Sequence, residues 1–116
     1  MEVSDILRIY GEAWVEQDTD KILSIFCKEG TYQERAFEKP FKGHAQIASY
    51  WKKKVCEEES DISFKLLNYY TFGIVVVAEW EASFRIENER IHIKEVAIIE
   101  IEDGLIKSFR EYWHKE

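Results

Sequence analysis

The 116-residue sequence has little of what binds metals, nucleotides or membranes. Its two cysteines, Cys27 and Cys56, form no Cys-x-x-Cys motif, and its three histidines share no spacing that would hold a metal. It has neither a glycine-rich phosphate loop nor a Gly-x-Ser-x-Gly motif, and no apolar stretch approaches the ~18 residues of a membrane span. We therefore expect no metal, no cofactor and no membrane span, with buried free thiols favoured over a disulfide.

Clustered positive charge is also scarce. The chain has 16 Lys and Arg residues against 23 Asp and Glu residues, a formal net charge of -7. Nucleic acids and anionic membranes are bound by clustered basic residues. The one basic run, Lys52–Lys54, is followed at once by Glu57–Glu59, so we interpret it as the solvated end of a helix, with an anion site as the alternative. Met1 leads directly into acidic residues without a secretion signal. These features predict a cytoplasmic protein that binds neither nucleic acid nor membrane.

The first part of the sequence has helical periodicity. Residues 4–17 repeat apolar side chains at steps of three and four, which places Tyr10 and Trp14 on one face. The sequence Asp18-Thr19-Asp20 is typical of a helix start, and it predicts a second, short helix that ends at Gly30.

The remainder changes from helical to strand character. A brief strand over residues 31–35 and a loop over 37–43 precede a third helix that buries Trp51. From Asp61 onward, β-branched and aromatic residues favour strands. Turn signals divide this region into four strands, and they lie at residues 70–73, 87–90 and 103–104. This order predicts one α+β domain over residues 1–116, with three N-terminal helices on one face of a curved, mostly antiparallel sheet.

The predicted turns determine which side chains share a face of the sheet. A two-residue turn at Asp103–Gly104 pairs Glu102 with Leu105, and counting back along both strands puts Glu95 opposite Tyr112. A similar turn at residues 88–89 brings the preceding strand to the same face. The residues expected beside this pair are Trp80, Ile93, Arg110 and His114. A one-residue bulge would move every partner to the opposite face.

Glu95 is the main candidate for chemistry, because an isolated carboxylate among apolar neighbours is costly to bury. Apolar walls would raise its pKa toward neutrality, where a general base is efficient. Tyr112 could then stabilise an enolate, and His114 could relay the proton. Arg110 could clamp a substrate carboxylate, or it could form an ion pair with Glu95 that leaves the acid inert. A purely structural network of Glu95, Arg110 and Tyr112 is therefore the competing interpretation.

Aromatic residues provide candidate ligand walls. Trp14, Trp51 and Trp80 are first of all core residues, but rigid aromatic walls that do not close completely bind flat apolar ligands. Tyr32 and Glu34 alternate onto one face of the first strand. Glu34 is therefore a second acid that could enter a cavity, although an exposed edge acid is the favoured interpretation.

The opposite face of the sheet is also partly apolar, so it needs a second cover. A second copy of the chain is the simplest cover, and a monomer with a mixed outer face is the alternative. The apolar residues expected on this dimer face are Val75, Val77, Val96, Ile98, Phe109 and Trp113.

The sequence resembles the nuclear transport factor 2-like superfamily and, within it, the SnoaL-like proteins. The likeness rests on the helix at residues 9–14, the stretches 30–32 and 40–51, and residues 103–106 running into 110–114. It implies a cystatin-like, cone-shaped α+β half-barrel with one largely apolar cavity, in a single SnoaL-like domain that often dimerises through its sheet. Enzymes of this superfamily include isomerases, polyketide cyclases, dehydratases and epoxide hydrolases, and other members bind or dock without catalysis.

One departure bears on the reaction that this resemblance implies. The last strand of the family often carries an Asp two residues after the Tyr, and this chain has His114 there. An Asp-based isomerase or an Asp-Arg-Asp epoxide hydrolase is therefore in doubt.

Two hypotheses follow. The first is a protein that binds a small, largely apolar molecule and transfers a proton on it without a cofactor, with Glu95, Tyr112 and His114 as its catalytic residues. The second is a non-catalytic homodimeric binding module whose cavity is filled by side chains. An open cavity lined by Glu95 favours the first hypothesis, and an ion pair between Glu95 and Arg110 in a filled core favours the second.

Overall fold

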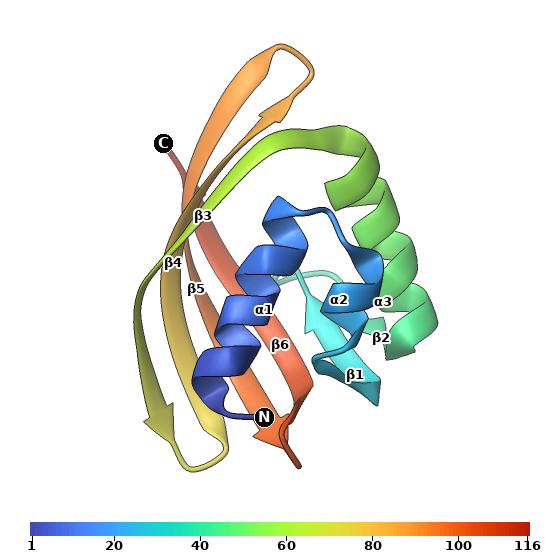
Figure 1. Cartoon of the computed structure of the whole chain (residues 1–116), viewed down its shortest axis with the longest axis vertical. Helices are drawn as coiled ribbons and strands as arrows, with labels where there is room; N and C mark the ends of the chain where they lie inside the picture. Colours follow the sequence, from blue (N-terminus) through green and yellow to red (C-terminus); the bar gives the residue numbers. More distant parts are fainter.

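Three helices and a curved sheet make up the computed structural model, which describes all residues 1–116 (Figure 1). The helices are α1 (Val3–Val15), α2 (Thr19–Leu23) and α3 (Gly43–Trp51), and π-helical turns over Lys52–Glu58 continue α3. The strands are β1 (Phe26–Gln33), β2 (Phe41–Lys42), β3 (Glu59–Phe72), β4 (Val75–Ile86), β5 (Glu89–Glu102) and β6 (Leu105–Lys115). The predicted α+β class is confirmed.

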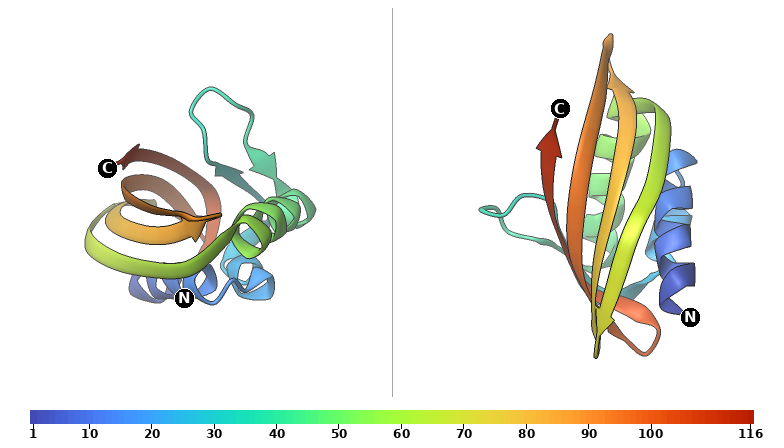
Figure 2. Two further views of the ribbon diagram at one scale, coloured as in Figure 1. Left: turned by 90° about the horizontal axis from the view of Figure 1, so that it is seen from above. Right: turned by 90° about the vertical axis from the view of Figure 1, so that its left-hand side faces the viewer.

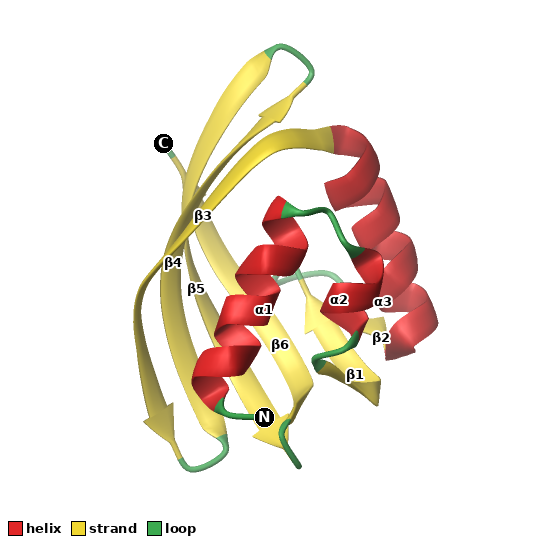
Figure 3. Cartoon of the chain, viewed as in Figure 1, coloured by secondary structure: helices red, strands yellow, loops and turns green.

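The six strands form one sheet in the order β2-β1-β6-β5-β4-β3. Every pair is antiparallel except β1 and β6, which run parallel. The sheet is strongly curved (Figure 2), and α1 and α3 lie against one of its faces (Figure 3). We call this covered side the inner face and the opposite side the outer face. The predicted arrangement of helices on one face of a mostly antiparallel sheet is therefore confirmed.

The core between the helices and the inner face is aromatic. Tyr10 on α1 lies at its centre, with the ring centroids of Trp51, Trp80 and Phe109 at 6.1, 5.0 and 5.1 Å. Phe109 also stacks on Tyr32 of β1, at 4.9 Å and an interplanar angle of 7°. Because these rings come from α1, α3 and three strands, their packing fixes these two helices over the sheet.

The second helix is shorter than the sequence predicts. It ends at Leu23, and β1 begins at Phe26, so Gly30 lies inside a strand and does not end a helix. Pairing with β6 overrides the local helical spacing, because the Ile106 amide donates to the Ile25 carbonyl oxygen at 2.7 Å. Gly30 allows a close approach here, since a Cβ at this position would lie 3.0 Å from the Ile106 carbonyl oxygen.

In the hairpin of β4 and β5, the side chains lie on the predicted faces of the sheet, but the residues pair in a different register. Its turn lies at Glu87–Asn88, one residue earlier than predicted, and Trp80 consequently pairs with Glu95. The partners shift by two residues, which is one full period of a strand. The prediction that Trp80 and Glu95 share a face is therefore confirmed, although the turn itself was predicted one residue too late.

The hairpin of β5 and β6 begins as predicted and then departs from the prediction. Glu102 pairs with Leu105 across the Asp103–Gly104 turn, in which both residues have positive φ. An extra residue at Lys107 then interrupts the ladder, so that Glu95 pairs with Trp113 and not with Tyr112. This bulge turns Phe109, Glu111 and Trp113 to the inner face and Arg110, Tyr112 and His114 to the outer face.

The bulge corrects two predictions. Arg110, Tyr112 and His114 do not share a face with Glu95, because the interrupted ladder exchanges the two faces of β6. Phe109 and Trp113 do not belong to the outer, dimer-forming face, because the same exchange buries Phe109 in the core and turns Trp113 inward. The other predicted members of that face, Val75, Val77, Val96 and Ile98, lie on it and are partly buried.

Both cysteines are free thiols, as predicted, although each is only partly buried. The Cys56 thiol donates a hydrogen bond to the Gln17 carbonyl oxygen at 3.2 Å. None of the helices combines the length and the apolar character needed to cross a membrane.

Candidate functional site

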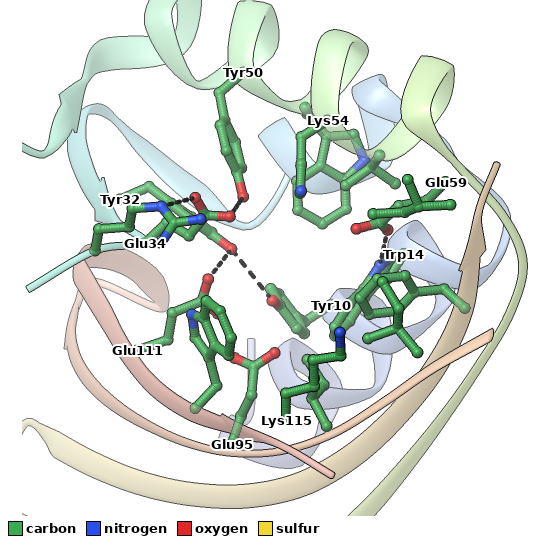
Figure 4. A pocket seen from close by; sticks show the side chains of 18 residues that line it. Tyr10, Trp14, Tyr32, Glu34, Tyr50, Lys54, Glu59, Glu95, Glu111 and Lys115 are labelled. Carbon is green, nitrogen blue, oxygen red and sulfur yellow. Dashed lines mark hydrogen bonds and ion pairs between the residues drawn. The ribbon is translucent and has the colours of Figure 1, made fainter. Parts of the chain in front are cut away.

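A cavity of about 130 Å³ lies between α1, α3 and the inner face of the sheet, and Figure 4 shows the side chains around it. Eighteen residues line it, and fourteen of them are aromatic, acidic or basic. The aromatic residues are Tyr10, Trp14, Tyr32, Tyr50, Trp51, Phe84 and Trp113. The acidic residues are Glu34, Glu59, Glu95 and Glu111, and the basic residues are Arg35, Lys54 and Lys115.

Glu95 lies in this cavity, on the inner face of β5. Its side chain is buried, with 4 % of the residue exposed, and its Oε2 atom has no hydrogen-bond partner. Burial raises the pKa of Glu95 above its usual value, and the proximity of Glu111 and of the Trp80 indole tempers the rise. A carboxyl group with a raised pKa in a partly apolar cavity is suited to exchange protons with a ligand.

Glu111 is the site residue that sequence reasoning missed. It lies on the inner face of β6, diagonally across from Glu95, and it is 6 % exposed. The Tyr32 hydroxyl donates a hydrogen bond to Glu111 Oε1 at 3.0 Å, whereas Oε2 has no partner. Burial raises the pKa of Glu111 well above its usual value, and the charge of Glu95 raises it further. Glu111 is therefore the protonated member of the pair when Glu95 is ionised.

Glu95 and Glu111 together form a carboxyl pair. Figure 4 shows both side chains reaching the same end of the cavity from neighbouring strands. Two carboxylates this close repel each other in a site with little water, so one proton held by the pair is the stable arrangement. The pair then contains an acid and a base at the same pH.

Two buried phenols, Tyr10 and Tyr32, and the partly buried Tyr50 extend this network. The Tyr10 and Tyr32 hydroxyl oxygens are 3.5 Å apart, which links the Tyr32–Glu111 hydrogen bond to α1. Burial is the largest cause that raises the pKa of Tyr10, Tyr32 and Tyr50, and neighbouring carboxylates add to it. All three phenols therefore remain protonated and act as hydrogen-bond donors or acceptors.

Glu34 also lines the cavity, as the less favoured interpretation of the sequence proposed. The Tyr50 hydroxyl donates to Glu34 Oε2 at 2.5 Å, and Arg35 Nε lies 3.6 Å from Glu34 Oε1. Its negative charge is therefore compensated at the edge of the cavity.

Glu59, at the start of β3, is the fourth acid of the cavity. The Trp14 indole N–H donates to Glu59 Oε1 at 2.8 Å. Burial raises the pKa of Glu59 to about 7, while the Trp14 hydrogen bond and the charge of Lys54 oppose the rise. This carboxyl group therefore changes its charge near neutral pH.

The three basic residues of the cavity all have acidic partners. Arg35 contacts Glu34, Lys54 Nζ lies 3.7 Å from Glu58 Oε1, and Lys115 Nζ donates to Glu89 Oε1 at 3.0 Å. Lys54 was expected to be part of a solvated helix end, yet its side chain reaches the cavity from the π-helical turns after α3. None of the three forms an ion pair with Glu95 or Glu111.

The predicted site residues divide into three groups. Trp14, Tyr32, Trp51 and Glu95 line the cavity together. Trp80 is fully buried behind it, packed on Tyr10 and Phe64, and does not line it. Arg110, Tyr112 and His114 lie on the outer face, where the bulge at Lys107 places them.

The signal that could have found Glu111 is the aromatic pattern of the last strand. Phe109 and Trp113 alternate with Glu111, so a core-facing position for the two aromatic residues brings Glu111 inward. The regular register that we expected would instead turn Arg110 and His114 toward the core.

A resident metal has no obvious ligands in this chain. No group of three His, Cys, Asp or Glu residues is arranged to hold a metal ion. The acids of the cavity are bound by Tyr, Trp and Arg partners or paired with each other.

Comparisons with known proteins agree with this architecture. A protein of ketosteroid isomerase-like fold from Catenulispora acidiphila, solved in complex with trimethylamine, is 17% identical over 92% of this chain and 83% of that one, with a TM-score of 0.83. An epoxide hydrolase from M. tuberculosis resembling LEH is 16% identical over 95% and 80%, with a TM-score of 0.79. An epoxide hydrolase/cyclase-like enzyme of pyran ring formation in salinomycin is 19% identical over 96% and 89%, with a TM-score of 0.81.

At these identities the solved structures establish the fold and leave the activity open. Among curated proteins, none matches the chain. The SnoaL-like domain family matches residues 6–109, which include every acid of the cavity except Glu111. The chain therefore belongs to the SnoaL-like domain family and has the nuclear transport factor 2-like, ketosteroid isomerase-like fold.

Proposed function

We propose that the chain binds a small, largely apolar molecule in this cavity and transfers a proton on it without a cofactor. The observation that carries the proposal is the pair of buried carboxyl groups, Glu95 and Glu111, at one end of an aromatic cavity. A pair that holds one proton supplies a base and an acid at the same pH. Isomerisation, dehydration and cyclisation all need these two functions.

In the proposed reaction, Glu95 removes a proton from a carbon next to a carbonyl group. Its raised pKa makes the carboxylate a stronger base than an exposed glutamate. Negative charge then develops on the carbonyl oxygen, and protonated Glu111 donates a hydrogen bond to it or transfers its proton. Trp51 is a second candidate donor, because it lines the cavity and its indole N–H has no partner. Returning the proton from Glu95 to another carbon would complete an isomerisation.

Tyr112 and His114 have no part in this proposal, because both lie on the outer face. Glu111 takes over the stabilisation of the enolate and the transfer of the proton that the sequence interpretation gave to them.

The competing hypothesis of a filled, non-catalytic cavity has less support. A space of about 130 Å³ remains between the side chains, close to the ~150 Å³ that holds a benzene molecule in an engineered protein cavity. The ion pair between Glu95 and Arg110 that would favour this hypothesis does not form, since the two residues lie on opposite faces.

The proposal also includes a homodimer through the outer face of the sheet, which would lie in the cytoplasm. Val75, Val77, Val96 and Ile98 give this face an apolar centre. Tyr112, which the bulge turns outward, is opposite Val96 and extends this centre. Free thiols are typical of a reducing compartment such as the cytoplasm.

Hydrogen–deuterium exchange on cyclopentanone tests the proton transfer. This ketone has a size suited to the cavity, and the loss of its α-proton signal in D2O, followed by NMR, reports removal of a proton next to a carbonyl. We expect the protein to accelerate the exchange above the buffer rate, and Glu95→Gln to remove about 100-fold or more of that acceleration. Glu79→Gln, which removes an equal charge from the outer face, is the matched control and should exchange at the wild-type rate.

The same experiment gives the outcomes that would contradict the proposed proton transfer. Exchange by Glu95→Gln at the wild-type rate would exclude Glu95 as the base. Exchange at the buffer rate by the wild-type protein, with cyclopentanone shown to bind, would leave a binding protein without this activity.

A further inference from the structure

The charges of the cavity are unevenly compensated. Each basic residue at its edge already has an acidic partner. Glu34 is likewise compensated, by the charge of Arg35 and the hydrogen bond from Tyr50. The carboxyl pair of Glu95 and Glu111 has no basic partner at all. Glu59 also forms no ion pair, but the Trp14 indole N–H donates a hydrogen bond to it. The protein therefore leaves the two neighbouring acids Glu95 and Glu111 without a compensating positive charge.

The unpaired oxygens of these two carboxyl groups indicate which kind of ligand would bind them. Both residues are more than nine-tenths buried, and so are their Oε2 atoms. Neither Oε2 atom accepts a hydrogen bond from another side chain or from the backbone. A proton held between the carboxyl groups satisfies part of this demand. A ligand that brings donors with a positive charge would satisfy all of it, because hydrogen bonds to charged groups are the strongest in proteins.

The walls of the cavity suit the same kind of ligand. Tyr10, Trp14, Tyr32, Tyr50 and Trp51 line the same cavity as the carboxyl pair, and the face of an aromatic ring attracts a cation. One ring of the cavity already receives a cation, since the Arg35 guanidinium lies 5.6 Å from the centroid of Trp113. Aromatic walls also bind the apolar substituents of a small organic amine, which an inorganic cation lacks.

We propose that the ligand of this cavity is a small organic cation, an ammonium group with compact apolar substituents, whose N–H donors bind Glu95 and Glu111. The proposal rests on the same ligand pocket as the proposed function and specifies its substrate class. A neutral molecule of equal shape would fill the same space and leave the carboxyl oxygens without a cationic donor. An anion would meet Glu95 and Glu111 without compensation and would be excluded.

Two isosteric probes separate charge from shape. tert-Butylammonium and tert-butanol have the same heavy-atom skeleton and are small enough for a cavity of about 130 Å³. Near pH 7 the first is a cation and the second is neutral. NMR titration of the indole N–H signals, of which Trp14 and Trp51 line the cavity, gives a dissociation constant for each probe. The measured quantity is the ratio of the two constants.

We expect the wild-type protein to bind tert-butylammonium about tenfold or more tightly than tert-butanol. Glu95→Gln and Glu111→Gln keep the size of the side chain, and each removes one carboxyl group of the pair that binds the ammonium donors, so each should reduce this ratio to about twofold or less. Their affinity for tert-butanol should stay near the wild-type value, which shows that the cavity is still folded. Glu79→Gln, with its charge removed from the outer face, should keep the wild-type ratio.

The outcomes distinguish this inference from the proposed function. Equal or tighter binding of tert-butanol to the wild-type protein would overturn the cation inference and leave the pocket intact, as would a cation preference that persists in both glutamine variants. Binding of neither probe would overturn the ligand pocket and the cation inference with it. A protein that prefers the cation but exchanges no cyclopentanone protons would lose the proton-transfer activity alone.

Discussion

Glu111 lies diagonally across from Glu95 on the inner face of the sheet because one extra residue, Lys107, interrupts the ladder between β5 and β6. Without this bulge, the strand would present Arg110 and Tyr112 to Glu95 in place of a second acid. The interruption therefore replaces a potential ion pair with a pair of carboxyl groups. Such a pair is expensive to ionise in a buried site, and this cost has measurable consequences.

The first prediction concerns the stability that the protein loses by burying Glu111. Burial and the charge of Glu95 raise the pKa of Glu111 in the folded state, so the folded protein holds its proton more tightly than the unfolded chain. The contribution of this group to stability is fully present below its unfolded pKa and is lost as pH rises toward the folded pKa. Glu111→Gln cannot ionise and still accepts the Tyr32 hydrogen bond. We expect it to be more stable than the wild-type protein by about 1–3 kcal/mol at pH 8.

Urea unfolding at pH 5 and pH 8 measures this effect. The difference in the free energy of unfolding between variant and wild type should be larger at pH 8 than at pH 5. Glu100→Gln is the control, because it removes an acid from the same sheet outside the cavity. An equal difference at the two pH values would show that the Glu111 carboxyl is not held in its protonated form by the fold. A gain in stability together with lost proton transfer would mark Glu111 as a residue kept for function.

Glu59→Gln tests a second titration, that of the acid whose pKa burial raises to about 7. The sign is the same: folding favours the protonated form, so its contribution to stability is present below about pH 4.5 and is lost as pH rises to about 7. Glutamine can still accept the Trp14 hydrogen bond. We expect the variant to lose less stability than the wild-type protein between pH 5 and pH 8, by up to about 3 kcal/mol.

Carbon-detected NMR of the Glu59 carboxyl group is the direct measurement for this second prediction. A midpoint near 7 would agree with the geometry, and a midpoint near 4.5 would contradict it. Glu57→Gln, at an exposed position two residues earlier, is the matched control for the unfolding experiment. It should leave the pH dependence of stability unchanged.

Much of the fold follows from local signals in the sequence. The helical spacing of Tyr10 and Trp14 predicts α1 and its buried face. The Asp103–Gly104 turn is predicted because positive φ at both positions suits Asp and Gly. The inward position of Glu95 also follows, since the shift of the preceding hairpin by two residues preserves the faces of its strands.

The remainder of the site could not be read from local signals, because tertiary packing decides it. The bulge at Lys107 has no turn residue or proline to announce it, and it is stable because it buries Phe109 against Tyr10 and Tyr32. Likewise, the position of Glu34 in the cavity depends on Tyr50, which approaches from a helix that is distant in the sequence.

Gly30→Ala tests the close approach of β1 to β6, the strand pairing that replaces the longer second helix predicted from the sequence. A Cβ at residue 30 would lie 3.0 Å from the Ile106 carbonyl oxygen and 3.1 Å from that of Cys27, and backbone atoms cannot move away as a flexible side chain can. We expect a loss of about 1–3 kcal/mol in the free energy of unfolding, measured in urea. Gly73→Ala is the comparison, since a Cβ there meets no atom within 4 Å and only its positive φ is unfavourable. A Gly30→Ala protein as stable as the wild type would show that β1 does not need this close approach to β6.

The last prediction concerns the outer face of the sheet. Val77 lies near the centre of this face, where it pairs with Ile98 on one side and Tyr70 on the other. If two copies associate through this face, Val77→Lys places a charge in an apolar interface and should convert the dimer to a monomer. Light scattering coupled to size exclusion measures the mass, and circular dichroism verifies that the variant is folded. Lys39→Glu changes a charge in the exposed loop before β2, so that variant should remain dimeric. A wild-type protein that elutes as a monomer at high concentration would contradict the dimer, and so would a Val77→Lys variant that stays dimeric. Neither result would alter the chemistry of the cavity, which lies on the inner face of the sheet.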